Sequence, residues 1–154
     1  MGNIAEKLID MLVEAGVKRI YAVTGDSLNK VNDAVRKDDR IQWIHVRNEE
    51  TGAFAAGAEA QLHDGLACCA GSSGPGHVHL INGLYDAHRS GAPVIAIASA
   101  LPTEEFGTAY FQETNTIRLF DDCSYYNQMA TTPEQLPRML QCAMQTAVTR
   151  RGVA

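Results

Sequence analysis

The sequence predicts an α/β protein with helices on both faces of a mainly parallel central sheet, a three-layer α/β/α sandwich. Short apolar segments with strand character alternate with segments of helical periodicity, as in parallel sheets with crossover helices. Segment 93–98 is apolar throughout, as expected for a strand buried on both faces. The 154 residues contain no repeat or low-complexity segment, so we expect residues 1–154 to form one domain.

The first half of the chain is predicted to begin with a helix. Asn3 and Glu6 form a capping-box pattern at the start of this helix, and Gly16 suits its end. Ser27 is placed to cap the second helix. In chain order, we expect a helix at 4–15, a strand at 19–23, a helix at 28–35, a strand at 41–46 and a helix at 49–63.

The second half continues the alternation around one long irregular segment, 101–114, and a loop of that length in a compact domain is often functional. Pro133 suits the first position of the last helix. Val153 and Ala154 look like the start of a further strand, so we expect a sheet without its last strand in a chain cut from a longer polypeptide. The predicted elements are strands at 66–70, 93–98 and 124–128, and helices at 76–89, 116–120 and 133–150.

Composition and charge limit the classes of partner. A net charge of -5 argues against nucleic acid or an anionic membrane as the main partner. No apolar run is long enough to span a bilayer, and the N-terminus does not have the pattern of a secretory signal. The four cysteines lack Cys-x-x-Cys spacing, and Cys68 and Cys69 should point to opposite faces of their strand. We therefore expect reduced thiols in a cytoplasmic protein.

Glu49 is the first candidate site residue. It lies where the predicted strand 41–46 is followed by the Ala- and Gly-rich helix, and ligands of open α/β sheets bind at the carboxyl ends of strands. A purely structural interpretation also exists. Asn48 is a good N-cap, and acidic residues in a first helical turn are stabilising by about 0.3–1 kcal/mol. The functional interpretation requires Glu49 to be buried.

The glycine-rich segment 71–76 is the second candidate. A turn of this kind between a strand and a helix can bring backbone N–H groups close to a ligand. It matches neither the dinucleotide fingerprint nor the Walker loop, so a simple tight turn remains an equal alternative, as it does for Thr24 and Gly25. His77 and His79 follow the turn and could lie near a ligand, but they lack the i, i+4 spacing of helical metal ligands, and we predict no metal site.

Several stretches together resemble the N-terminal pyrimidine-binding domain of thiamine diphosphate enzymes. The resemblance covers essentially the whole chain and is strongest to flavin-containing, quinone-reducing pyruvate oxidases, with acetolactate synthases next. The stretches that carry it are Ala15-Gly16-Val17, Val23–Leu28, Arg47–Glu50, Ala55-Ala56-Gly57, Ser73–Gly76, Asn82–Ala87, Pro93-Val94 and Tyr110–Glu113.

The resemblance implies a role for each candidate residue. In this family, the glutamate at the position of Glu49 hydrogen-bonds N1′ of the cofactor's aminopyrimidine ring and activates the cofactor by proton exchange. Thr24 and Gly25 would line the pyrimidine, and Gly74, Pro75 and Gly76 would line the cofactor pocket. Phe111 and Gln112 would lie on the substrate side. Asp26 and Glu50 are weaker candidates.

Two departures from the family pattern matter. Many members carry a histidine before the glutamate, where this sequence has Asn48. The Gly-Asp-Gly…Asn motif, which holds Mg²⁺ and the diphosphate in a C-terminal domain, does not occur in residues 1–154, and neither does the middle domain that carries FAD. The resemblance therefore implies half of a cofactor site, completed by the diphosphate-binding domain of a neighbouring subunit in a homodimer or homotetramer. Any peripheral membrane association would depend on an absent C-terminal region.

The sequence thus predicts a domain of an enzyme that oxidatively decarboxylates pyruvate, a small 2-oxo acid, and predicts that the isolated chain is inactive. An acetolactate synthase or a 2-oxo acid decarboxylase is the alternative within enzymes. A non-catalytic α/β module that binds a partner through its Ala- and Gly-rich helix is the alternative from another class.

Overall fold

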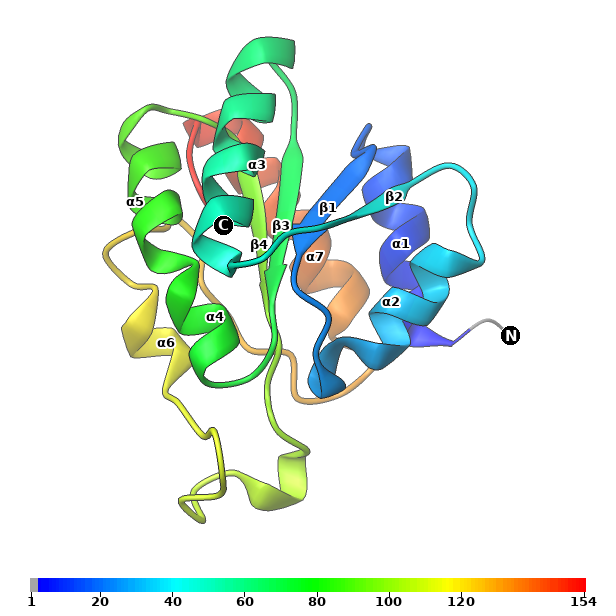
Figure 1. Cartoon of the computed structure of the whole chain (residues 1–154), viewed down its shortest axis with the longest axis vertical. Helices are drawn as coiled ribbons and strands as arrows, with labels where there is room; N and C mark the ends of the chain where they lie inside the picture. The colour runs from blue at the N-terminus through cyan, green and yellow to red at the C-terminus, as the bar shows by residue number, and fades with distance from the viewer. Residues whose placement is uncertain (1–2) are drawn as a thin grey trace.

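The computed structural model describes residues 3–154 and contains a four-stranded sheet in which all strands are parallel, in the order β2-β1-β3-β4 (Figure 1). The central strand β3 is buried along its whole length, whereas β2 forms an edge and is only partly covered. The strands are β1 (Arg19–Ala22), β2 (Gln42–His45), β3 (Ala67–Gly71) and β4 (Val94–Ala98).

Helices cover both faces of the sheet, which confirms the predicted three-layer sandwich (Figure 1). Helices α1 (Ile4–Glu14), α2 (Asn29–Arg36) and α7 (Leu136–Arg150) pack on one face. Helices α3 (Glu49–His63) and α5 (Ile81–Arg89) pack on the other, next to the short α4 (Pro75–His79) and α6 (Thr116–Leu119). Two short 3-10 helices, η1 (Asp26–Leu28) and η2 (Thr103–Glu105), follow β1 and β4. None of the helices described is both long and apolar enough to cross a membrane.

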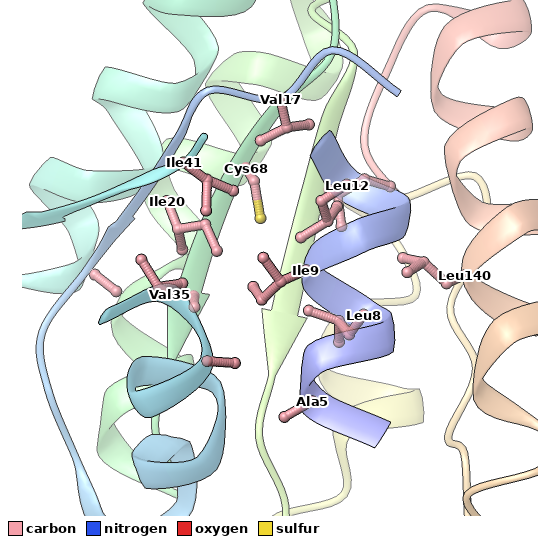
Figure 2. Close-up of a cluster of buried hydrophobic side chains, with 14 of the residues drawn as sticks. Ala5, Leu8, Ile9, Leu12, Val17, Ile20, Val35, Ile41, Cys68 and Leu140 are labelled. Carbon is pink, nitrogen blue, oxygen red and sulfur yellow. The ribbon is translucent and has the colours of Figure 1, made fainter. Parts of the chain in front are cut away.

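The larger core lies between the sheet and α1, α2 and α7 (Figure 2). Leu8, Ile9 and Leu12 recur at helical spacing on α1 and are buried against it. Cys68 points into this core, whereas Cys69 belongs to the core on the opposite face, as the alternation of a strand predicts. All four cysteines are free, and burial raises the pKa of the Cys69 thiol to about 12.

The second core depends on small residues of α3 and α5. A Cβ atom on Gly83 would lie 2.5 Å from Cβ of Ala53, so the two helices approach at a distance that only glycine permits there. A Cβ on Gly57 would lie 3.2 Å from Cβ of Ala87, a less severe contact. The outer side of α3 exposes Phe54 to solvent, which the Ala- and Gly-rich pattern did not indicate.

Most predicted elements occur at the expected positions. The Asn3–Glu6 capping box is present, Gly16 follows the C-cap of α1 at φ +91°, and α3 has the predicted bounds. The prediction of a continuous helix at 76–89 was wrong. The helix is interrupted at Leu80, whose N–H donates a hydrogen bond to the carbonyl of His77. The capping role of Ser27 was also wrong. Ser27 lies within η1, and no side chain caps α2.

The C-terminal part differs most from expectation. Segment 124–128 forms no strand, and its Tyr125 N–H donates to the carbonyl of Val153. Helix α7 begins at Leu136, after Pro133, because residues 132–135 form a turn in which the Gln135 side chain accepts from the Thr131 N–H. Val153 forms a parallel bridge with Val94, so the last two residues do extend along the edge of β4.

Candidate functional site

The candidate site lies at the edge of the sheet where the carboxyl ends of the parallel strands meet. The segments that follow β1, β2 and β3 all reach this edge: the turn before η1, the start of α3, and the glycine turn before α4. Peptide segments far apart in sequence are therefore adjacent, which is the arrangement in which α/β sheets bind ligands.

Glu49 is buried at this edge, with 8% of its surface exposed. Asn48 caps α3 by accepting a hydrogen bond from the Glu50 N–H at 2.8 Å, so the helix places Glu49 as its first residue. Oε2 of Glu49 lies 3.1 Å from Nδ1 of His79. Among residues 3–154, no group donates a hydrogen bond to Oε1, which lies on the side of Gly76. One oxygen of a buried carboxylate is thus held and the other is available.

The glycine turn leaves no room for side chains around this carboxylate. A Cβ on Gly76 would lie 3.3 Å from Glu49 Oε1 and 3.0 Å from the Ser72 side chain. A Cβ on Gly25 would lie only 2.4 Å from Ser72 Oγ, so the turn after β1 approaches the glycine turn at a distance that requires glycine.

Ser27 joins the two turns in place of its predicted capping role. Its Oγ accepts from the Ser73 N–H and lies 2.9 Å from Ser72 Oγ. Its carbonyl accepts from the Ser99 hydroxyl at 2.8 Å. The ends of β1, β3 and β4 are therefore connected by hydrogen bonds between hydroxyl and backbone groups.

The segment after β4 carries the predicted substrate-side residues. Phe111 is 79% exposed, and Gln112 adopts a left-handed φ of 66°. Gln112 packs on the glycine turn, where Gly74 has φ +67° and a Cβ would lie 2.7 Å from Gln112 Cβ. The Ser73 hydroxyl donates to Gln112 Oε1 at 3.4 Å. Ser73 and Gln112 line a cavity of about 610 Å³, together with His77 and Thr114.

The structure brings some predicted residues together and leaves others apart. Glu49 and Gly76 are adjacent, Gly25 reaches them through Ser72, and Gln112 contacts Gly74. Thr24, Asp26 and Pro75 are exposed around them, and Glu50 accepts a hydrogen bond from Asn82 instead of facing Glu49.

The direct partner of Glu49 was missed, since the sequence placed His79 only near a ligand. Nothing in the sequence signalled the links through Ser27 and Ser72 either, because they join residues 45 positions apart. No group of three or more His, Cys, Asp or Glu side chains within the described part of the chain is arranged to hold a metal ion.

Comparison with known proteins identifies the family of this chain. Residues 2–119 match the family described as the thiamine pyrophosphate enzyme, N-terminal TPP binding domain. The chain belongs to this family. Thiamine pyrophosphate is the cofactor also called thiamine diphosphate. The match includes β1 to β4, the glycine turn, Glu49 and the segment with Gln112, and it confirms both the family resemblance and the fold class.

Three relatives illustrate where this TPP-binding domain occurs. An "uncharacterized 42.6 kDa protein in isoamylase 3′ region" of Pseudomonas amyloderamosa is 56% identical over 99% of the chain. A pyruvate oxidase of Lactiplantibacillus plantarum is 39% identical over 96% of the chain. A probable acetolactate synthase large subunit of Methanocaldococcus jannaschii is 32% identical over 96% of the chain. The chain spans only 38%, 24% and 25% of the lengths of these relatives, in that order.

Proposed function

We propose that this chain is the pyrimidine-binding domain of an enzyme that oxidatively decarboxylates pyruvate, with Glu49 as the residue that activates thiamine diphosphate. The observation that supports this most directly is the Glu49 carboxylate itself. It is buried at the carboxyl edge of a parallel sheet, with one oxygen held by His79 and the other left available.

The residues at this edge fit an aminopyrimidine. The uncommitted Oε1 of Glu49 can accept a hydrogen bond from a protonated ring nitrogen or, when protonated, donate one to the neutral nitrogen. A Cβ on the adjacent Gly76 would lie 3.3 Å from Oε1, so glycine keeps a side chain away from this oxygen. Thr24 and Gly25 would line the ring, and Gly74 and Pro75 would line the remaining wall of the pocket.

When bound, thiamine diphosphate supplies the nucleophilic carbon and the electron sink that decarboxylation of a 2-oxo acid requires. Glu49 exchanges a proton with the ring nitrogen that it contacts. Only 8% of Glu49 is exposed, so little water reaches the carboxylate, which favours this exchange. Phe111 and Gln112 would lie on the side where the 2-oxo acid enters, and Mg²⁺ and FAD would be held outside residues 1–154.

We further propose that the site is completed by the diphosphate-binding domain of a neighbouring subunit in a homodimer or homotetramer. His79, which contacts Glu49, and Phe111 both expose surface that such a partner could contact. An acetolactate synthase or other 2-oxo acid decarboxylase activity is the second candidate, because an acetolactate synthase is among the relatives that cover almost the whole chain. The two candidates differ in the acceptor that they use. The pyruvate-oxidising enzyme uses an oxidant, whereas an acetolactate synthase uses a second 2-oxo acid.

The test uses the protein at its natural length with Glu49→Gln. Glutamine keeps the shape of the side chain but cannot exchange the proton, so we expect thiamine diphosphate-dependent decarboxylation of pyruvate to fall by about 100-fold or more. Glu50→Gln is the matched control, because Glu50 is the next residue and glutamine can still accept the hydrogen bond from Asn82. Activity of Glu49→Gln within a few-fold of the Glu50→Gln protein would refute the assignment of Glu49. Acetolactate as the product would favour the second candidate.

A further inference from the structure

His77 contacts both ends of the long segment between β4 and α6. The segment leaves the sheet at Ser99 and rejoins the regular structure at Thr116, and Figure 1 shows that it extends away from the body of the domain. His77 lies in α4 and is 1% exposed. Its Nδ1 is 2.9 Å from the carbonyl oxygen of Ser99, and its Nε2 contacts the hydroxyl of Thr114.

The hydrogen-bond partners define the tautomer of this histidine. A carbonyl oxygen only accepts, so Nδ1 must carry the proton that is donated to Ser99. Burial lowers the pKa of His77, which favours the neutral ring. Nε2 of the neutral ring then has a lone pair and accepts the hydrogen bond from the Thr114 hydroxyl. One buried imidazole thus connects Ser99 to Thr114.

The part of the segment between these two residues has little regular structure of its own. It contains η2 and three residues with left-handed φ, namely Gly107, Ala109 and Gln112. Most of its side chains are exposed, although Leu101, Phe106 and Glu113 are half-buried, and Gln112 contacts Ser73 and Gly74. A segment with so few buried contacts depends on the anchors at its ends for a defined position.

We propose that His77 is a positioning residue that fastens both ends of segment 99–114 to α4 and thereby sets the place of Phe111 and Gln112 beside the candidate site. The effect of this anchoring on substrate binding rests on the proposed function, whereas its effect on the order of segment 99–114 does not. His77 does not reach Glu49, because both of its ring nitrogens are occupied by Ser99 and Thr114.

Substitutions of Thr114 test this proposal in the protein at its natural length. Thr114→Val keeps the shape but removes the hydroxyl, and Thr114→Ser keeps the hydroxyl. Thr108→Val is the matched control, because the Thr108 hydroxyl lies in the same segment but donates to the carbonyl of Glu105, away from His77. His77→Asn is a second variant, since its amide can still donate to Ser99 but is too short to reach Thr114.

Hydrogen–deuterium exchange of the amides in 101–113 is the first readout. We expect Thr114→Val and His77→Asn to accelerate exchange there by about three- to tenfold, the loss expected for one hydrogen bond. Exchange in α1 should stay unchanged, Thr114→Ser should match the unmodified protein, and any change in Thr108→Val should stay within 105–108, the turn that its hydroxyl bridges. Equal exchange rates for Thr114→Val and Thr114→Ser would overturn the proposal.

Steady-state kinetics is the second readout. Thr114→Val should raise KM for pyruvate by about three- to tenfold, while the Kd for thiamine diphosphate changes less than twofold. Faster exchange with an unchanged KM would keep the anchoring role and overturn its role in substrate binding. Failure of the Glu49→Gln test would leave the exchange result valid, so the two proposals fail separately.

Discussion

Nδ1 of His79 lies 3.1 Å from Oε2 of Glu49 and pairs a half-exposed imidazole with the buried carboxylate of the candidate site. The two residues start and end different helices, Glu49 as the first residue of α3 and His79 as the last of α4. The contact orients the carboxylate, because it holds Oε2 and leaves Oε1 directed toward Gly76. A side chain that fixes the rotamer of the proposed activating carboxylate should affect turnover without being essential to it.

Substitution of His79 should therefore lower kcat moderately. On the proposed function, we expect His79→Ala to reduce kcat for pyruvate by about tenfold, the lower end of the loss expected for one hydrogen bond to a charged group, because the imidazole is half-exposed. His79→Asn should retain most of the activity, because its amide nitrogen lies near the place of Nδ1 and can donate to Glu49. His63→Asn, at the exposed end of α3, is the control. Equal kcat for His79→Ala and His79→Asn would show that the hydrogen bond is not what matters.

Because α3 and α5 approach closely, we expect substitution by alanine to be destabilising at one helical glycine and tolerated at another. Gly83→Ala should lower the free energy of unfolding by about 1–3 kcal/mol, because its Cβ would overlap Cβ of Ala53. Gly57→Ala should be close to neutral, because its milder contact with Ala87 is offset by the roughly 1 kcal/mol that alanine gains over glycine in a helix. Urea unfolding of both variants measures the difference. Similar midpoints would contradict the packing of these two helices.

Two buried histidines predict a dependence of stability on pH. Burial lowers the pKa of His77 and of His88 from the usual 6.5. The unfolded chain then binds more protons than the fold between the lowered pKa values and 6.5, so stability is full above pH 6.5 and falls as the pH decreases below it. Thermal unfolding should show a decreasing Tm from pH 7 to pH 5.

His77→Asn should make this decrease in Tm shallower, because asparagine does not titrate. The Asp38 carboxyl does not contribute in this range, since the hydrogen bonds from Arg40 lower its pKa to about 2. A Tm that stays constant between pH 7 and pH 5 in the unmodified protein would contradict the burial of neutral histidines.

Ser27 connects the turns after β1 and β3, and removal of its hydroxyl should destabilise both turns. Ser27→Ala leaves the Ser73 N–H without its acceptor, so we expect the free energy of unfolding to decrease by about 1 kcal/mol. Ser27→Thr, which keeps the hydroxyl, and Ser90→Ala, at an exposed position, should differ little from the unmodified protein. Chemical denaturation distinguishes these cases, and an unaffected Ser27→Ala protein would mean that the Ser27 hydroxyl does not support the turn.

Local sequence patterns predicted the elements well where short-range chemistry decides them. The capping box at Asn3, the N-cap Asn48 and the bounds of α3 depend on residues within one helical turn of each other. The prediction of a strand at 124–128 was wrong. These residues have a strand-like composition, but it is Val153 that pairs with the edge of β4. Ser27 failed as a cap because a hydroxyl that suits a helix start equally suits the backbone of Ser73, 46 positions away.

The sequence by itself determined the layered α/β fold and the TPP-binding family, and it made Glu49 the leading candidate for the site, because periodicity, caps and ordered motifs are all visible in one dimension. Only the tertiary structure decided that Glu49 is buried, that His79 holds it, and that His77 links Ser99 to Thr114. These contacts join residues brought together by the parallel register of the strands. A hydrogen bond between residues so far apart in the sequence depends on the packing of the whole chain, so no local pattern predicts it.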